Sequence, residues 1–571
     1  MDRRRFLHAA AAALGPALFA PERALGAAAQ AAAVRGRPRA GAADLLLRGA
    51  LVYDGTGAPP IEADVRVSGD RIVEVGPRLA ARGAEEVDLR GLALAPGFID
   101  IHAHTDLVLL VNPRADSKVR QGVTTEVAGQ DGSSVGPLTK EAFERRRESY
   151  RQRYGVDLDF RDLGGFFRRL DEQGAAVNLA SMVGAGTIRG YVVGQDDRPA
   201  TPEELARMVA LVEEALRQGA CGLSSGLEYT PGAFADRNEL VALARVLRGT
   251  GLPYASHMRN EDDELLAAVE EAIAIGRQAG VPVQISHLKA QGKRNWWKGQ
   301  PVLDLIESAR AAGTDVMFDR YPYIAYSTSL SNLFPVWTRD GGSAAFVARL
   351  QDPALRERIE AAVREKVEDE LGSWDAVQVT SVGDAFAWAR GRRMGELARE
   401  RGEDPYALLL RIMIEGGGGG MVGFGMSEEN TARFLAHPLG MICSDGGAQA
   451  RSAEEMEGSV HPRNYGTFPR VLGYYCRDQK IMPLETAIHK MTGMPAARLR
   501  LEGRGRIAPG AFADLVAFDP DTVADRATFE RPHQYPVGIP HVLVNGEFVI
   551  RDGEHTGAKP GRVVRPGGLA G

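Results

Sequence analysis

The sequence has only three cysteines in 571 residues, Cys221, Cys443 and Cys476. Their number is odd and they lie far apart, which argues against a disulfide framework of the kind found in small secreted domains. We expect all three to be small buried side chains. The chain also lacks a large excess of charge of either sign, since its formal net charge is -6. Because no basic stripe with interleaved aromatic residues is present, we expect no nucleic-acid partner.

The chain also lacks an apolar run long enough to span a bilayer as a helix. The run Ala9–Ala20 is short, is interrupted by a glycine and a proline, and follows the basic residues Arg3–Arg5. This arrangement is typical of a twin-arginine export signal, with cleavage near Ala24–Gln30. A disordered basic N-terminus is the alternative. We therefore expect a periplasmic or secreted protein without a stable membrane anchor, and residues 1–40 are left out of the fold.

Short alternating segments occur at both ends of the remaining chain. Residues 41–95 and 502–571 alternate polar and apolar side chains around Asp-Gly, Asn-Gly and Pro-Gly turns, which is the pattern of β-hairpins. Two β segments that bracket a long middle predict one discontinuous β-domain, made of both chain ends packed together. Residues 96–501 alternate strand-like apolar runs with helical stretches. That repetition predicts a parallel α/β architecture, a TIM-like (β/α)₈ barrel.

Two segments depart from the simple strand–helix repeat. Residues 131–162 are rich in arginine, glutamate and tyrosine, and we expect an exposed helix there. Residues 336–420 read as an inserted subdomain or lid over the barrel mouth, with its own helices. It ends in five consecutive glycines, Gly416–Gly420, which predict a flexible hinge or loop.

The stretch LALAPGFIDIHAHTD contains the most informative motif. If Ile99–Ile101 is a strand, His102 and His104 point to the same face because side chains alternate along a strand. Two imidazoles on one face at a strand end can bind one metal ion as neighbouring ligands. Asp106 lies two residues after His104, so in a continuing strand it would point to the same face, where it could orient a histidine ring. The alternative is two solvated histidines in a loop.

Further polar residues follow other apolar runs. His257 lies in ASHMR, His287 in ISHLK, Asp445 in ICSDG and Asp131 in GQDG. Each of them alone is more often a partly buried side chain than a ligand. Because active-site residues of a (β/α)₈ barrel gather at the carboxyl ends of its strands, we expect six side chains to converge on divalent cations at a single rim: His102, His104, Asp131, His257, His287 and Asp445.

These motifs resemble those of the amidohydrolase superfamily, and within it the D-aminoacylase (N-acyl-D-amino-acid deacylase) family. The matching segments are PGFIDIHAHTD, GVTT, GLSSGLEYTPG, SHMRNE, SHLK, ICSDG, HPRNYGTFPRVLG and ADLVAFDP, in that order. They extend over nearly the whole chain from Asp44 to Val563. The resemblance implies a (β/α)₈ barrel with a β-sandwich from both termini and a zinc site at the barrel mouth, holding one or two ions.

The resemblance also implies a role for each matching residue. His102 and His104 match the ligands of one metal position, and His257 and His287 match those of the second, tighter position. Asp445 matches an aspartate that contacts the first metal and serves as general base and acid. Four residues match positions that bind the carboxylate of the substrate: Lys289, Tyr321, Ser327 and Arg463.

Three departures from the family pattern are present. Asp131 stands where the family has a zinc-binding cysteine in Gly-Asn-Cys-Gly. A carboxylate can still bind zinc and bridge two metals, so we expect two metals held more evenly, or acceptance of other divalent ions. The alternative is that Asp131 points elsewhere and one zinc binds weakly. Ala185 stands where family members often have histidine, and the stretch from Asp445 to His461 is longer than usual.

The sequence therefore predicts a metal-dependent amidohydrolase that acts on linear amides. The first hypothesis is zinc-dependent hydrolysis of N-acyl-D-amino acids to a carboxylate and a free D-amino acid. A related amidohydrolase, such as a dipeptidase acting on D- or L-residues, is the alternative. A catalytically inactive binding protein on the same scaffold is a third hypothesis. In each case the expected partner is a small molecule, an N-acyl amino acid or a dipeptide, and the oligomeric state cannot be read from the sequence.

Overall fold

The structure, a computed structural model, describes residues 44–449 and 459–568. The expected export signal lies outside the described residues. Among the described residues, no helix combines the length and apolar character needed to cross a bilayer. The three cysteines are buried and free of disulfides, as the sequence predicts.

Eight parallel strand positions surround one axis within the described residues. They are β6 (Phe98–Asp100), β7 (Val123–Ala128), the consecutive β8 (Asn178–Ser181) and β9 (Val183–Gly184), β10 (Leu223–Gly226), β11 (Tyr254–His257), β12 (Val283–Ile285), β13 (Val316–Arg320) and β17 (Gly440–Ile442). Every pairing between neighbouring strands of this set is parallel. Beyond their ends, the amide of Asp445 donates to the carbonyl of His102 at 2.9 Å, and His104 donates to Gly446 at 3.0 Å. These two bonds join the last strand to the first and close the ring.

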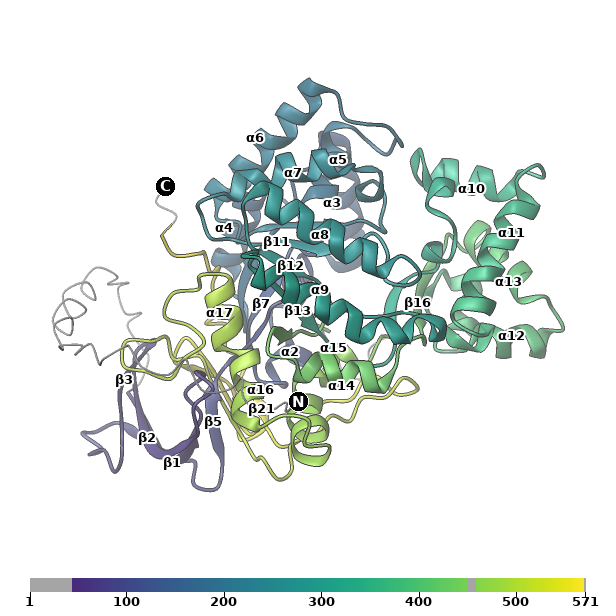
Figure 1. The fold of residues 1–571 in the computed structure, drawn as a ribbon. Helices are drawn as coiled ribbons and strands as arrows, with labels where there is room; N and C mark the ends of the chain where they lie inside the picture. The colour runs from purple at the N-terminus through teal and green to yellow at the C-terminus, as the bar shows by residue number, and fades with distance from the viewer. Residues whose placement is uncertain (1–43, 450–458, 569–571) are drawn as a thin grey trace, which may run out of the picture. The chain divides into compact units, whose positions relative to one another are not determined.

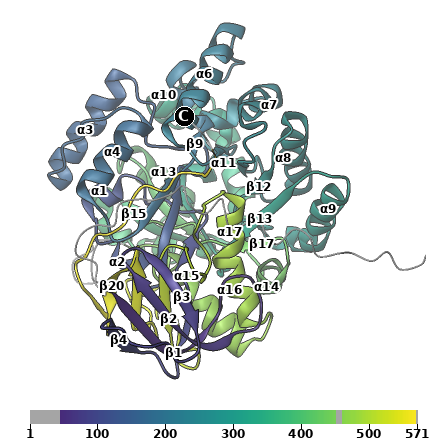
Figure 2. The same cartoon turned by 90° about the vertical axis from the view of Figure 1, so that its left-hand side faces the viewer.

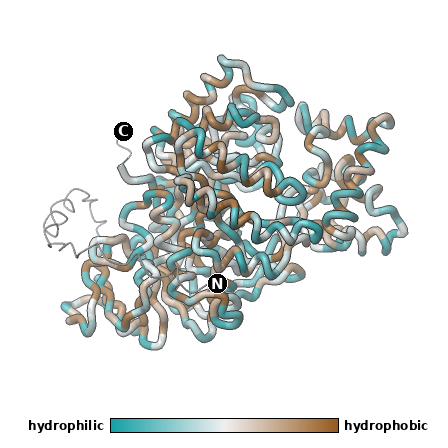
Figure 3. The backbone as a smooth tube through the Cα atoms, viewed as in Figure 1, coloured by the Kyte–Doolittle hydropathy of each residue, from teal (hydrophilic) through white to brown (hydrophobic). Residues whose placement is uncertain are grey.

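Helices connect the successive strands and cover the outside of the ring (Figures 1 and 2). They are α4 (Leu163–Gln173), α5 (Ala185–Val192), α6 (Pro202–Gln218), α7 (Arg237–Ala244), α8 (Leu265–Ala279), α9 (Gly299–Ala311), α14 (Glu428–Ala436), α16 (Leu484–Met491) and α17 (Gly493–Arg498). Helix α6 begins with a capping box, in which the Thr201 and Glu204 side chains each bind the other's backbone amide. The strands are buried along their length, and apolar segments concentrate in the middle of Figure 3.

Helix α3 (Lys140–Tyr154) occupies the segment expected to be an exposed helix, and it has no buried residue. Shorter helices fill the remaining connections: α1 (Val108–Val111), α2 (Asp116–Val119) and α15 (Arg463–Arg470), which continues into a π-helix at Val471–Asp478. Helix α2 packs against β7 and α15, next to the point where the ring closes.

The two chain ends form one continuous nine-stranded sheet. It contains β1 (Leu45–Val52), β2 (Ile61–Ser68), β3 (Arg71–Gly76), β4 (Glu85–Asp88), β5 (Ala93–Pro96), β18 (Leu515–Phe518), β19 (His541–Val544), β20 (Glu547–Arg551) and β21 (Glu554–His555). Strands β5 and β18 pair antiparallel and join the two ends. The sheet curves back toward itself. Its edge strand β3 reaches the segment just before β18, where the Ile72 amide donates to the Ala511 carbonyl at 2.9 Å. Both chain ends therefore build one β-domain, as the sequence predicts.

The insertion forms a cluster of four helices seen at one side of Figure 1: α10 (Gly342–Gln351), α11 (Arg356–Arg364), α12 (Met394–Arg401) and α13 (Pro405–Ile414). A three-stranded antiparallel sheet accompanies them, with β16 (Gly419–Gly423) between β14 (Tyr326–Ser329) and β15 (Val377–Val382). The expectation of a loop across Gly416–Gly420 is wrong for its second part, because Gly419 and Gly420 lie in the central strand. A side chain at Gly419 would lie 2.1 Å from the Ser381 carbonyl, so glycine permits this close pairing.

Candidate metal centre

All six expected ligands lie at the carboxyl ends of barrel strands. His102 and His104 follow β6, Asp131 follows β7, and His257 is the last residue of β11. His287 and Asp445 follow β12 and β17 in the same way. Because these strands are parallel members of one ring, their carboxyl ends meet at one rim.

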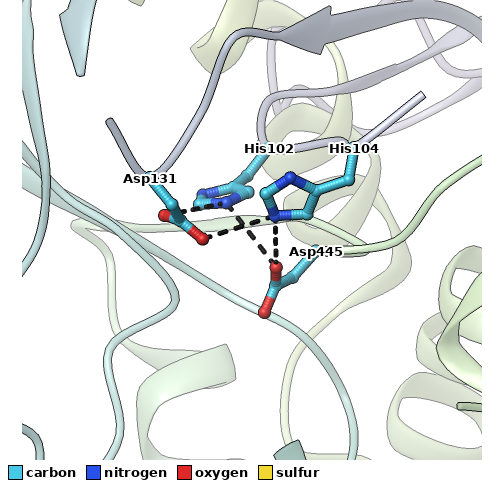
Figure 4. Close-up of side chains that lie close together, drawn as sticks. All are labelled: His102, His104, Asp131 and Asp445. Carbon is cyan, nitrogen blue, oxygen red and sulfur yellow. Dashed lines mark hydrogen bonds and ion pairs between the residues drawn. The ribbon is translucent and has the colours of Figure 1, made fainter. Parts of the chain in front are cut away.

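The first group contains His102, His104, Asp131 and Asp445, each offering an atom within 4.8 Å of the others. Asp131 lies 3.3 Å from Nε2 of both His102 and His104, through different carboxylate oxygens. Asp445 Oδ1 lies 3.0 Å from His104 Nε2 and 3.6 Å from His102 Nε2. Figure 4 shows the two carboxylates facing the two rings. This arrangement offers two imidazole nitrogens and two carboxylate oxygens to one point.

The second group contains Asp131, His257 and His287, again with atoms within 4.8 Å of one another. Asp131 Oδ1 lies 3.3 Å from His287 Nε2, and Oδ2 lies 3.7 Å from His257 Nδ1. The carboxylate of Asp131 therefore faces all four histidines and belongs to both groups. The expectation that six side chains converge at one rim agrees with these distances.

The chemistry of this donor set fits divalent metal ions. Histidine nitrogens and carboxylate oxygens are the ligands that zinc and similar ions take in proteins. Both ring nitrogens of His102, Oδ1 of Asp131 and Nε2 of His257 are buried without a hydrogen-bond partner among the described residues. Buried polar atoms in native proteins are normally paired, so these atoms point to a ligand that completes them.

The two carboxylates are held in the ionised form. Burial acts to raise the pKa of Asp131, but the neighbouring rings of His102 and His287 outweigh it and keep the pKa well below its usual range. Burial acts in the same direction on Asp445, where Arg463 is the largest opposing influence and the pKa again falls well below its usual range. Ionised oxygens are the form that binds a metal.

A cavity of about 390 Å³ opens onto the two groups. Three of the four residues expected to bind a substrate carboxylate line it: Lys289, Ser327 and Arg463. Arg463 Nη1 donates to Asp445 Oδ2 at 2.7 Å. Lys289 Nζ lies 2.6 Å from Glu261 Oε1. Both cations are therefore paired with protein carboxylates at the cavity wall.

The structure does not bring Tyr321 to the cavity wall. Its side chain is fully buried, and its hydroxyl has Met426 sulfur as its neighbour at 4.0 Å. The ring packs against the cations of Lys289 and Arg463, at 5.7 and 5.0 Å from its centre. The contact of Tyr321 with substrate stays a prediction, and in this structure its ring packs beside the two cations of the cavity wall. Ala185 begins α5 and is also absent from the cavity wall.

Within the described residues, Asp106 has no hydrogen bond between its carboxylate and a histidine ring. It accepts a hydrogen bond from the backbone amide of Gly129 at 3.2 Å, and its backbone has left-handed φ of 29°. The expectation assumed that strand alternation continues to Asp106, but β6 ends at Asp100. Asp319 of β13 lies near His102 instead, with 3.6 Å between Oδ1 and Nδ1.

Sequence reasoning missed Glu261, the buried carboxylate that neutralises Lys289. Its Oε1 also lies 3.1 Å from His287 Nδ1. The segment SHMRNE carried a signal for it, since Glu261 follows the expected ligand His257 by four residues. Glu228 was missed as well. Its carboxylate lines the cavity and lies 3.6 Å from His257 Nε2.

Comparison with known proteins agrees with this geometry. The family model described as the amidohydrolase family matches residues 85–300 and 456–550 of this chain. A D-aminoacylase from Alcaligenes xylosoxydans xylosoxydans is 39% identical over 530 residues, covering 91% of this chain and 97% of that protein. The chain belongs to the amidohydrolase family. An N-acyl-D-aspartate deacylase from the same organism is 38% identical over 92% of this chain and 95% of that protein. The resemblance drawn from the motifs is confirmed.

Solved structures of the family show the same fold. A D-aminoacylase crystal structure matches with a TM-score of 0.76 at 38% identity, covering 92% of this chain and 100% of that one. An N-acyl-D-glutamate deacylase from Bordetella bronchiseptica, complexed with zinc and a phosphonate inhibitor, matches with a TM-score of 0.76 at 33% identity, over 92% and 99% of the two chains. Another D-aminoacylase structure is described as having a binuclear metal center. The predicted barrel fold and the hydrolase class are thereby confirmed.

Proposed function

We propose that this chain hydrolyses the amide bond of N-acyl-D-amino acids, giving a carboxylate and a free D-amino acid, and that its metal is zinc. The observation that carries the proposal is the position of Asp131, whose carboxylate faces all four histidines while Asp445 faces the first pair. The relatives described as D-aminoacylase and as N-acyl-D-aspartate and N-acyl-D-glutamate deacylases support the substrate class.

Two positions would hold zinc. The first would use His102, His104, Asp131 and Asp445, and the second would use Asp131 with His257 and His287. Zinc bound there supplies Lewis acidity toward the amide carbonyl and makes water acidic enough to ionise near neutral pH. Proton transfer and binding of the substrate are carried out by side chains of this protein.

Asp445 is the residue that moves the proton. Arg463 binds Oδ2, which leaves Oδ1 facing His104 and the cavity. An ionised carboxylate at this place accepts the proton of the attacking water and returns it to the leaving amine. The low pKa of Asp445 keeps it in the accepting form before the reaction.

Arg463 and Lys289 provide the positive charge that a substrate carboxylate requires. A planar guanidinium can bind a carboxylate through two parallel hydrogen bonds, whereas an ammonium acts as a point charge. Ser327 on the same wall adds a hydroxyl donor. The cavity of about 390 Å³ suits a small molecule rather than a protein chain.

One observation favours a second candidate, hydrolysis of a dipeptide. Glu228 lines the cavity, and no lysine or arginine nitrogen lies within 4.0 Å of its carboxylate in the described part of the chain. A carboxylate without a cation could bind the free ammonium group of a dipeptide, which an N-acyl amino acid lacks. Glu228→Gln would then lower activity on dipeptides while leaving activity on N-acetyl amino acids.

We also propose export by the twin-arginine route. The support is the run Arg3–Arg5 ahead of the short apolar segment Ala9–Ala20. Replacing Arg4 and Arg5 by lysine should retain the full-length protein in the cytoplasm. Processed protein in the periplasmic fraction of that variant would contradict the proposal.

The function is tested by incubating the purified zinc-loaded protein with N-acetyl-D-amino acids, N-acetyl-L-amino acids and dipeptides. We expect release of free D-amino acid, and a decrease in kcat of about 10²–10⁴-fold in Asp445→Asn because a general acid and base contributes that much. Bound metal is measured in parallel by elemental analysis. Unchanged turnover in Asp445→Asn would show that the base is assigned wrongly, and no turnover of any amide would end the proposal.

A further inference from the structure

The barrel closes at the point where Asp445 meets the histidine pair. Within the described residues, β6 and β17 share no ladder of paired strand residues, and a single bridge joins Ala103 to Gly446. Two backbone hydrogen bonds complete the seam, from Asp445 to His102 at 2.9 Å and from His104 to Gly446 at 3.0 Å. The distance between Asp445 and the metal-binding histidines therefore depends on how firmly this short seam is held.

The backbone of Asp445 is itself strained. Its φ of 51° is left-handed, a conformation in which the side chain crowds the following carbonyl oxygen. Such a conformation persists only where the surroundings fix it. Besides the direct bonds of Asp445 to Arg463 and His102, the surroundings can act on it through its neighbours Ser444 and Gly446.

Lys118 binds both of these neighbours. From helix α2 its Nζ donates to Ser444 Oγ at 2.8 Å and to the Gly446 carbonyl at 2.9 Å. The third hydrogen bond goes to Asp100 Oδ2 at 2.7 Å. An ammonium has three donors, and these three acceptors together with Glu126 Oε1 at 3.0 Å surround them.

Asp100 extends the same connection to the first strand. It is the last residue of β6 and lies two positions before His102. Its carboxylate accepts from the Ser444 amide at 2.8 Å and from the Ser444 hydroxyl. One carboxylate of the first strand and one ammonium from α2 thus bind the residues that flank Asp445 on the last strand.

Stability alone does not account for charges at this place. Lys118, Asp100 and Ser444 are completely buried, as is Glu126, whose Oε1 lies 3.0 Å from Lys118 Nζ. Replacing a buried ion pair or triad by packed apolar side chains is often neutral or stabilising. What apolar residues cannot supply is directed hydrogen bonds to both neighbours of one residue.

We propose that Lys118 is a positioning residue that fixes the Asp445 carboxylate at the metal centre by binding both neighbours of Asp445 to the first barrel strand. The inference rests on the proposed function, in which Asp445 moves the proton. Lys118 itself does not line the cavity, so it acts only through Asp445.

The test uses three variants of the full chain. Lys118→Met removes the ammonium at similar length, and Ser444→Ala removes one of its acceptors with minimal change in volume. Lys490→Met is the matched control, because Lys490 is also a buried helical lysine, its Nζ donates to the His437 carbonyl, and it does not line the cavity. The measurements are kcat, KM, bound metal, and hydrogen–deuterium exchange of the peptide that contains residues 440–447.

We expect Lys118→Met to lower kcat by about 10–100-fold, since small misplacements of a catalytic group have effects of that size. Ser444→Ala should lower it less, in the same direction. KM and the bound metal should stay within about twofold, because substrate binding is not altered. The Asp445 amide should exchange faster in both variants, since its bond to His102 is loosened, and Lys490→Met should change neither kcat nor this exchange.

The inference would be overturned if Ser444→Ala had the wild-type kcat per metal-loaded molecule and the wild-type rate of hydrogen–deuterium exchange at residues 440–447. Ser444→Ala decides alone if Lys118→Met does not fold. If the wild-type protein hydrolyses no amide, the proposed function fails, and the exchange of the 440–447 peptide still tests whether Lys118 holds the seam.

Discussion

Asp131 is the side chain on which the metal centre depends most, and Asp131→Asn is its sharpest perturbation. The substitution keeps the size of the side chain and removes one of the two negative charges in the donor set. In the structure its oxygens lie 3.3 Å from His102, His104 and His287 and 3.7 Å from His257. We therefore expect both metal positions to weaken together.

The magnitude follows from burial of the charge. Removing one partner of a buried ionic contact costs about 3–5 kcal/mol, and each 1.4 kcal/mol is a factor of ten in affinity. The zinc affinity of Asp131→Asn should thus fall by about two to four powers of ten. Competition against a chromophoric chelator measures this affinity, and elemental analysis after dialysis counts the ions retained.

Asp106→Asn is the matched control. Asp106 is another aspartate near His104, and it binds the Gly129 amide, which an asparagine oxygen can also do. Its zinc affinity should remain within about threefold of the wild type, since no charged group in either metal group is lost. Equal affinities in Asp131→Asn and Asp106→Asn would show that Asp131 is not a metal ligand.

Three further predictions concern residues around the site and away from it. Glu261→Gln leaves the buried cation of Lys289 without a carboxylate and should lower the free energy of unfolding by about 3 kcal/mol, measured by urea denaturation. Tyr321→Phe should leave KM within about twofold, because the side chain is fully buried with its hydroxyl beside the Met426 sulfur; a tenfold increase in KM would support the predicted contact of Tyr321 with substrate. Burial lowers the pKa of Lys490 from 10.5 to about 7, so the unfolded chain binds the extra proton between these values and stability rises with pH across that window. Lys490→Met should therefore reduce the rise of the unfolding free energy with pH by up to about 1.4 kcal/mol per pH unit, measured by urea unfolding at pH 7 to 10. An unchanged rise would contradict the lowered pKa of Lys490.

The convergence of the six expected ligands could be predicted because each stands at or just after the end of an apolar strand. His102, His257 and Asp445 follow runs whose burial fixes them as barrel strands, and parallel strands end at one rim. The sequence could not predict which carboxylates would neutralise the cations of the site. Glu261 and Asp319 contact side chains that follow other strands. Such contacts depend on the directions of side chains in space, which the periodicity of the sequence does not reveal.

The errors have a common physical origin. Alternation along a strand assigned Asp106 to the metal face, but the backbone turns after β6 and the alternation ends there. Composition assigned the glycines at 419 and 420 to a loop, although both pair with β15 in a strand, where a side chain at Gly419 would meet the Ser381 carbonyl. In both cases a local pattern was overridden by a contact distant in sequence, which no local rule contains.

Backbone strain at the rim explains why aspartate suits position 131 apart from its charge. Asp131, His287 and Asp445 all have left-handed φ, at 52°, 34° and 51°, and each lies two or three residues beyond the end of its strand. Aspartate, asparagine and histidine tolerate this conformation better than other residues with side chains. Cysteine, the residue that the resemblance places at this position in relatives, lacks that tolerance.

Asp131→Cys therefore tests strain and ligand chemistry separately. Without metal it should be less stable than Asp131→Asn by about 1 kcal/mol, because only the asparagine keeps the preference for left-handed φ. With zinc the order should reverse, since a thiolate restores the negative charge that asparagine lacks. Thermal unfolding of both variants with and without zinc gives the two comparisons. If the cysteine variant is the more stable of the two in the absence of metal, the conformation at position 131 does not select aspartate, and its charge alone explains the residue.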